Sequence, residues 1–94
     1  MQLYGYQLRP YNGIFKTEIV EVEEKAKTYK GDFGLTCGSV CNKSDIGRLM
    51  GISKNIIYFL EPNVALAKSI LKNKYVNEYQ DALNRYNICM KALS

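Results

Sequence analysis

Histidine is absent from the 94-residue chain. Its absence excludes Ser-His-Asp triads, Cys-His nucleophile pairs and histidine metal sites. Neither a phosphate-binding loop nor a dinucleotide fingerprint occurs. The letters GDFG at residues 31–34 match part of a kinase signature, but no Gly-rich loop or catalytic loop accompanies them, so we interpret the match as chance. We therefore expect a protein that is not an enzyme and has no catalytic residues and no cofactor.

Cysteine is scarce, and its count is odd, with only Cys37, Cys41 and Cys89. A secreted domain of this size more often carries an even set of paired cysteines, so we expect reduced thiols inside a cell. The three thiols could complete a four-cysteine zinc site only with another chain. The sequence therefore predicts no metal site and no required disulfide.

Long apolar runs and low-complexity segments are also missing. The longest apolar run, residues 56–60, is far shorter than the roughly 20 residues with which a helix crosses a bilayer. Residues 1–13 lack the basic head and the apolar core of a signal peptide. These features predict one soluble domain, residues 1–94, in the cytoplasm and without a membrane partner.

The first half of the chain has the pattern of β-structure. Residues 3–8 alternate with two tyrosines and Leu8 on one face, and the Asn-Gly pair at residues 12–13 is a strong turn signal. Residues 17–30 are rich in strand-forming types, although their glutamate, lysine and alanine also suit a helix. We favour one long bent strand over residues 17–30, or two strands that meet near Glu24 and Lys25.

Residues 17–30 also separate an apolar face from a charged face. Val20 and Val22 fall on the apolar face, whereas Tyr29 falls with the glutamates and lysines on the other, which is typical of a solvated sheet surface. A second interpretation follows from the net charge of +4, since lysines can bind phosphates and a tyrosine ring can stack on a base. The candidate partner-binding or nucleotide-binding residues are then Lys25, Lys27, Tyr29, Lys30, Lys43 and Arg48.

The middle of the chain is less regular. Glycines at positions 31, 34 and 38 weaken the preference for regular structure there, so we expect residues 35–41 to be either a loop or another strand. Ser44 can cap a short helical turn at residues 45–50, which Gly51 would end. The β-branched and aromatic run at residues 56–60 predicts a buried strand that ends at Pro62. Residues 1–61 are thus expected to be mainly β.

One long helix is predicted from Val64 to Leu93, with Asn63 as its N-cap. Apolar residues recur along it at close to 3.6-residue spacing, as on one face of a helix. The expected fold class is therefore α+β: a small antiparallel sheet of three to five strands packed on one long C-terminal helix.

The predicted helix is longer than the sheet that must cover it. Thirty residues span about 45 Å, but a strand of five or six residues spans about 17–20 Å. We expect the outer half of the helix to overhang and to pair with a second copy, in a homodimer whose interface holds Tyr79, Leu83, Tyr86 and Met90. The alternative is a bend at residues 73–77 that folds the end back.

Three segments carry a resemblance to other proteins: EVEEKAKTYK (residues 21–30), NKSDIGRL (residues 42–49) and YFLEPNVALAKSIL (residues 58–71). In this order they resemble small uncharacterised proteins encoded by phages and prophages of low-GC Gram-positive bacteria. That group has no established activity. The resemblance implies a long C-terminal helix and the cytoplasm of a bacterial host, and small phage proteins without catalytic equipment often act by obstructing a host enzyme.

Three functions follow as hypotheses. The first is a non-catalytic, phage-encoded binding protein that inhibits or sequesters a host defence factor, anti-CRISPR-like in role, with a host protein as partner. The second is a nucleic-acid or nucleotide binder that uses the basic residues above. The third is a structural protein that self-assembles through its helix.

Overall fold

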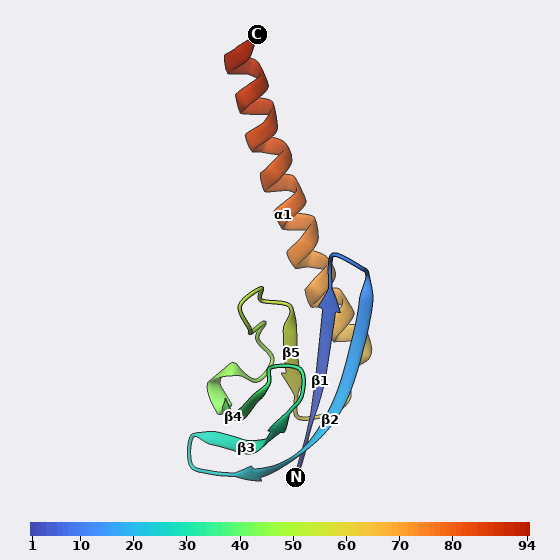
Figure 1. Ribbon diagram of the computed structural model, residues 1–94, viewed down its shortest axis with the longest axis vertical. Coiled ribbons are helices and arrows are strands. Elements are labelled where there is room, and N and C mark those ends of the chain that lie inside the picture. The colour runs from blue at the N-terminus through green and yellow to red at the C-terminus, as the bar shows by residue number, and fades with distance from the viewer.

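The computed structural model describes residues 1–94 as one antiparallel five-stranded sheet followed by one long helix (Figure 1). The elements are β1 (Gln2–Arg9), β2 (Ile14–Glu24), β3 (Thr28–Phe33), β4 (Gly38–Asn42), the 3₁₀ turn η1 (Lys43–Asp45), β5 (Ile56–Phe59) and α1 (Val64–Leu93). The strand order is β4-β3-β2-β1-β5. The predicted α+β class is confirmed.

Strands β1 and β2 form a long hairpin, paired from Gln2 with Glu21 at one end to Arg9 with Ile14 at the other. The Asn-Gly turn signal is confirmed: Gly13 has a φ of 71° and its N–H donates to the Arg9 carbonyl at 2.8 Å. The turn needs this left-handed backbone, which glycine adopts at little cost.

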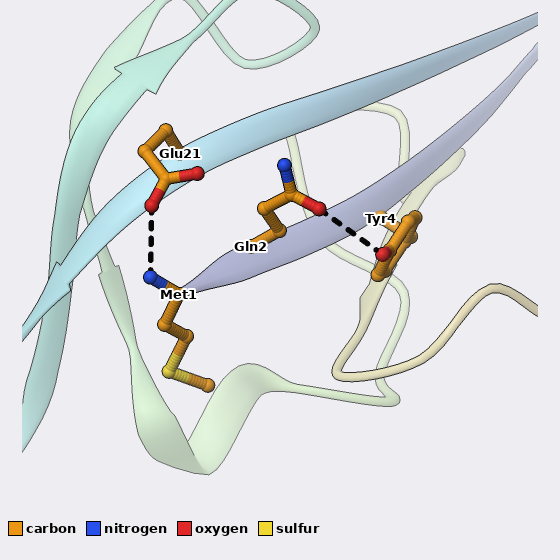
Figure 2. A network of polar contacts seen from close by, with 4 residues as sticks. All are labelled: Met1, Gln2, Tyr4 and Glu21. Carbon is orange, nitrogen blue, oxygen red and sulfur yellow. Dashed lines mark hydrogen bonds and ion pairs between the residues drawn. The ribbon is translucent and has the colours of Figure 1, made fainter.

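At the opposite end of the hairpin, one polar contact ties Met1 to β2 and a second lies within β1 (Figure 2). The ammonium group of Met1 donates to Glu21 Oε1 at 2.8 Å, and the Tyr4 hydroxyl donates to Gln2 Oε1 at 3.2 Å. The ammonium lowers the pKa of Glu21, first through this hydrogen bond and then through its charge. All of these groups lie at the surface, so the contacts orient the strand end more than they stabilise the fold.

Residues 17–30 form two strands, so the second of the two predicted arrangements is confirmed. A short turn joins β2 to β3 and brings the Lys25 N–H within 2.8 Å of the Thr28 carbonyl. This turn changes which residues face the core, from the even-numbered ones in β2 to the odd-numbered ones in β3. Because Val22 pairs with Gly31, odd-numbered residues of β3 share the buried face of β2, and Tyr29 is only 6% exposed. Its predicted place on the solvated face is wrong.

The middle of the chain contains a strand, β4, in the segment where the sequence predicted either a loop or a strand. The predicted helical turn at residues 45–50 is wrong: a 3₁₀ turn occupies Lys43–Asp45 instead, after Asn42 and not after a Ser44 cap. It ends early because Ile46 is extended and Gly47 has a φ of 78°, which breaks helical geometry.

The curled sheet has apolar clusters on both of its faces. The larger cluster lies inside the curl and comprises Leu3, Val20, Val22, Tyr29, Phe33, Cys41, Ile56 and Tyr58. The smaller one comprises Tyr6, Ile57 and Phe59 from the sheet and Ala67 from α1. Strand β5 alternates between the two clusters and all four of its residues are buried, which confirms the buried strand expected at residues 56–60.

The helix meets the sheet only through its first turns. Asn63 caps it, as predicted, with its side chain accepting from the Leu66 N–H at 3.0 Å, while its own N–H donates to the Tyr6 hydroxyl at 3.0 Å. Ala67 and Leu71 are its only buried residues. The helix continues unbroken through residues 73–77, and the molecule is 59 Å long but only 23 Å and 20 Å across (Figure 1). The alternative of a folded-back end is wrong, and the predicted overhang is confirmed.

Candidate protein-binding surface

Residues 76–93 of α1 project beyond the sheet, and every one of them is exposed (Figure 1). We call this part of the helix the overhang. It contains all four predicted interface residues, Tyr79, Leu83, Tyr86 and Met90, which are between 37% and 63% exposed. The structure therefore leaves their apolar surface without an intramolecular partner.

The apolar residues of the overhang alternate at spacings of three and four. They are Val76, Tyr79, Leu83, Tyr86, Met90 and Leu93, and we call this set the seam. Such spacing has a mean period of 3.5 residues, the period with which one helix keeps contact with another in a coiled coil. Sequence reasoning noted the stripe at helical spacing but did not identify this heptad pattern, although the signal was present in the residue numbers.

The flanks of the seam carry no charge. Gln80 and Asn87 border it on one side, and Ala82 and Cys89 border it on the other, as the 100° turn per residue places them. Like charges at these positions would repel a second helix, whereas uncharged residues leave the pairing of identical helices unopposed.

A groove of about 550 Å³ lies where the overhang begins, between α1 and the tip of the β1–β2 hairpin. Its lining is Leu8 and Phe15 from the hairpin and Lys68, Leu71, Lys72, Tyr75, Val76 and Tyr79 from the helix. Val76 and Tyr79 belong to both the groove and the seam, so the two form one continuous apolar surface.

Two details of the groove bear on what it can bind. The Lys68 ammonium stands 5.4 Å from the centroid of the Phe15 ring, so its charge is partly directed over that ring. The Tyr75 hydroxyl oxygen is covered from solvent and has no hydrogen-bond partner.

A second, smaller hollow of about 360 Å³ lies at the start of the helix. Phe59, Pro62 and Leu66 contribute to its lining, together with Glu61 and Asn63. Its lining shares no residue with the seam or with the larger groove.

Three of the six predicted partner-binding or nucleotide-binding residues are paired with an acidic side chain or buried. Lys25 Nζ lies 2.7 Å from Glu23, and Lys43 Nζ lies 2.9 Å from Glu24. The hydrogen bond from Lys25, and then its charge, lowers the pKa of Glu23.

Tyr29 cannot present its ring to a base, since the ring is buried in the core and the Lys43 ammonium stands 5.3 Å from its centroid. Lys27, Lys30 and Arg48 are exposed and take part in no ion pair. The structure thus places the basic residues on a surface of alternating charge and not in a single cationic groove.

A row of partly buried polar contacts crosses the sheet, and sequence reasoning missed it. Gly5 of β1 pairs with Glu18 on one side and with Tyr58 on the other. Because Gly5 has no side chain, the Tyr58 ring lies across β1 and its hydroxyl donates to Glu18 Oε2. The Glu18 carboxylate also accepts from the N–H groups of Gly34 and Leu35, at 2.9 Å and 3.0 Å.

Burial raises the pKa of Tyr58 well above its usual value, and the hydrogen bond to Glu18 raises it further. The alternation places Glu18 on the same face as Val20 and Val22, but only the paired strands show that it meets Tyr58. The role of the row is to hold the β3–β4 turn onto β2.

The three cysteines are free, and they differ in exposure: Cys37 and Cys89 are exposed, and Cys41 is buried. Burial is also the main cause that raises the pKa of the Cys41 thiol. No group of three or more potential metal-ligating side chains is close enough to hold a metal ion.

No match to this chain was found when it was compared with protein-family models, with curated proteins and with solved structures. The one helix of the fold lacks the combined length and apolarity that crossing a membrane requires.

Proposed function

We propose that this protein is a non-catalytic binding protein whose working surface is the seam and the adjoining groove. The observation that supports this is the exposed apolar strip of the overhang. Taking about 150 Å² for each of its six large side chains, and weighting by their exposed fractions, gives roughly 500 Å² of exposed apolar surface. A patch of that size on a monomeric protein is commonly a site of interaction.

The biological role that we propose is obstruction of a host factor by a phage-encoded protein, anti-CRISPR-like in effect. This part of the proposal is supported by the resemblance of residues 21–30, 42–49 and 58–71 to small phage and prophage proteins. Binding of a host protein, in the cytoplasm of a bacterium, would then be sufficient for function and would need no cofactor.

A nucleic-acid role has weaker support. Glutamates lie within ion-pair distance of Lys25 and Lys43, and a phosphate would have to compete with them. Tyr29, the intended stacking residue, is buried.

Affinity capture from a bacterial lysate at low salt tests the binding function. We would compare the tagged wild type with the double variant Leu83→Glu/Tyr86→Glu, which places two charges in the seam. Ile88→Glu is the matched control, because Ile88 is 68% exposed and lies nine residues from Tyr79, on the opposite side of the same helix. We expect the wild type and the control to retain a host protein that the double variant loses, and purified host protein to reproduce the difference. Recovery of no host protein by the wild type would contradict the proposal.

A further inference from the structure

We infer that the seam binds the seam of a second copy, as an antiparallel two-helix coiled coil in which the end of each helix enters the groove of the other copy. The inference rests on the proposed function, because it concerns the same surface: two copies pair through the seam, and the pair is then the form that binds a host protein. It adds the orientation and the register of the pair, and it makes the groove part of the interface.

The spacing of the seam is the first argument. Its six positions alternate by three and four over residues 76–93, a length of about 26 Å along the helix. A helix with the same 3.5-residue repeat keeps contact with such a stripe along its whole length. The chain provides one in a second copy of itself.

The area that pairing would bury is the second argument. Roughly 500 Å² of exposed apolar surface on each copy gives about 1,000 Å² for the pair, which reaches the lower range of specific protein–protein interfaces. The groove adds Leu8 and Phe15 to that area, because both side chains line it beside Val76.

The sequence of the seam favours the antiparallel orientation. Aligning Val76 with Leu93 of the second copy also aligns Tyr79 with Met90 and Leu83 with Tyr86, so that every layer is apolar and no two tyrosines meet. A parallel pair in register would set each tyrosine against itself. It would also bring Lys72, which continues the seam one turn before Val76, against Lys72 of the other copy. Antiparallel helix dipoles add a small favourable contribution.

The groove fits this register. The antiparallel alignment brings Met90 and Leu93 of the second copy beside Tyr79 and Val76, at the mouth of the 550 Å³ groove. The Met90 side chain is unbranched and flexible, so it can fill an irregular apolar space.

Sedimentation velocity over a wide range of concentration tests the association. We expect the wild type and Ile88→Glu to be dimers, and Leu83→Glu/Tyr86→Glu to be a monomer of half the mass. Leu83 and Tyr86 are exposed in the single chain, so the double variant should keep its circular dichroism spectrum. A wild type that is monomeric at every concentration, or a double variant that remains dimeric, would overturn the inference.

The distance between labels on the two copies tests the orientation. A spin label on exposed Cys37, with Cys89→Ser to leave one accessible thiol, reports how far apart the two sheets lie. In the antiparallel register the two Ala67 residues are 35 residues apart along the paired helices, or about 50 Å. We expect long Cys37–Cys37 distances of at least that order, and short distances from sheets lying side by side would overturn the antiparallel arrangement.

The two proposals fail separately. If the wild type is a monomer but host-protein capture still depends on the seam, the second copy is wrong and the binding function stands. If the dimer forms as described but the lysate yields no host protein, the host-factor role fails and the dimer stands.

Discussion

The bridge between Glu18 and Tyr58 holds two distant strands together, and breaking it should have a measurable cost. Tyr58 is fully buried, and its hydroxyl donates to the Glu18 carboxylate across Gly5. Two backbone N–H groups, those of Gly34 and Leu35, donate to the same carboxylate. Glu18→Ala removes the acceptor from all three donors, whereas Tyr58→Phe removes a single hydroxyl and keeps the ring.

The magnitudes follow from which groups lose a partner. In Glu18→Ala the buried Tyr58 hydroxyl is left unsatisfied, while Gly34 is exposed and its N–H can turn to water. We expect a loss of about 2–4 kcal/mol in the free energy of unfolding. Tyr58→Phe leaves the carboxylate with its two backbone donors, so the expected loss is about 1–2 kcal/mol.

A double-mutant cycle measured by urea unfolding isolates the bridge. In the Phe background Glu18→Ala should cost less by a coupling energy of about 1–2 kcal/mol. Glu23→Ala, on the same strand but in an exposed pair with Lys25, is the control and should change stability by less than about 0.5 kcal/mol. Additive effects of the two substitutions at positions 18 and 58, within about 0.3 kcal/mol, would refute the reasoning.

Three further predictions concern the same fold. Gly5→Ala should lower the free energy of unfolding by about 1–3 kcal/mol in a urea titration. The added Cβ would lie 2.9 Å from Cδ1 of the Tyr58 ring, and that ring packs edge-on to Phe33 and cannot move aside. An unchanged free energy of unfolding would mean that the ring has room. The folded protein raises the pKa of Tyr58, so above pH 10 the unfolded chain releases a proton that the folded chain keeps. The free energy of unfolding of the wild type should therefore fall with pH more steeply than that of Tyr58→Phe, by about 1.4 kcal/mol per pH unit. Parallel alkaline unfolding curves would contradict this. Asn63→Ala should lower the free energy of unfolding by about 1 kcal/mol in thermal unfolding, because the Leu66 N–H loses its hydrogen-bond acceptor. Asn63→Ser should recover most of that loss. Equal losses from the two substitutions would show that the cap is not the cause.

Much of the architecture could be predicted from local patterns. The helix from Val64 to Leu93, its cap at Asn63 and the Asn-Gly turn at residues 12–13 depend on residues close in the chain, and the structure has all three. The overhang was also predictable, because helix length and strand length follow from residue counts alone. These features need no knowledge of which strands pair.

The candidate site was predictable only in part. Tyr79, Leu83, Tyr86 and Met90 follow from the apolar stripe, and the structure leaves them exposed together. The groove beside them was not predictable, because it requires the tip of the β1–β2 hairpin to lie against the helix, and no local signal specifies that contact.

The sequence by itself determined the first hairpin turn, the buried strand at residues 56–59 and the long helix, since each arises from side-chain preferences within a few residues. Only the tertiary structure decided which side chains those elements bury. A turn of three residues changed the register of β3 and took Tyr29 from the surface into the core. Pairing of three strands brought Glu18 and Tyr58 together across a glycine, although 40 residues separate them. The physical reason is that burial depends on register between strands, and register is set by the packing of the whole sheet.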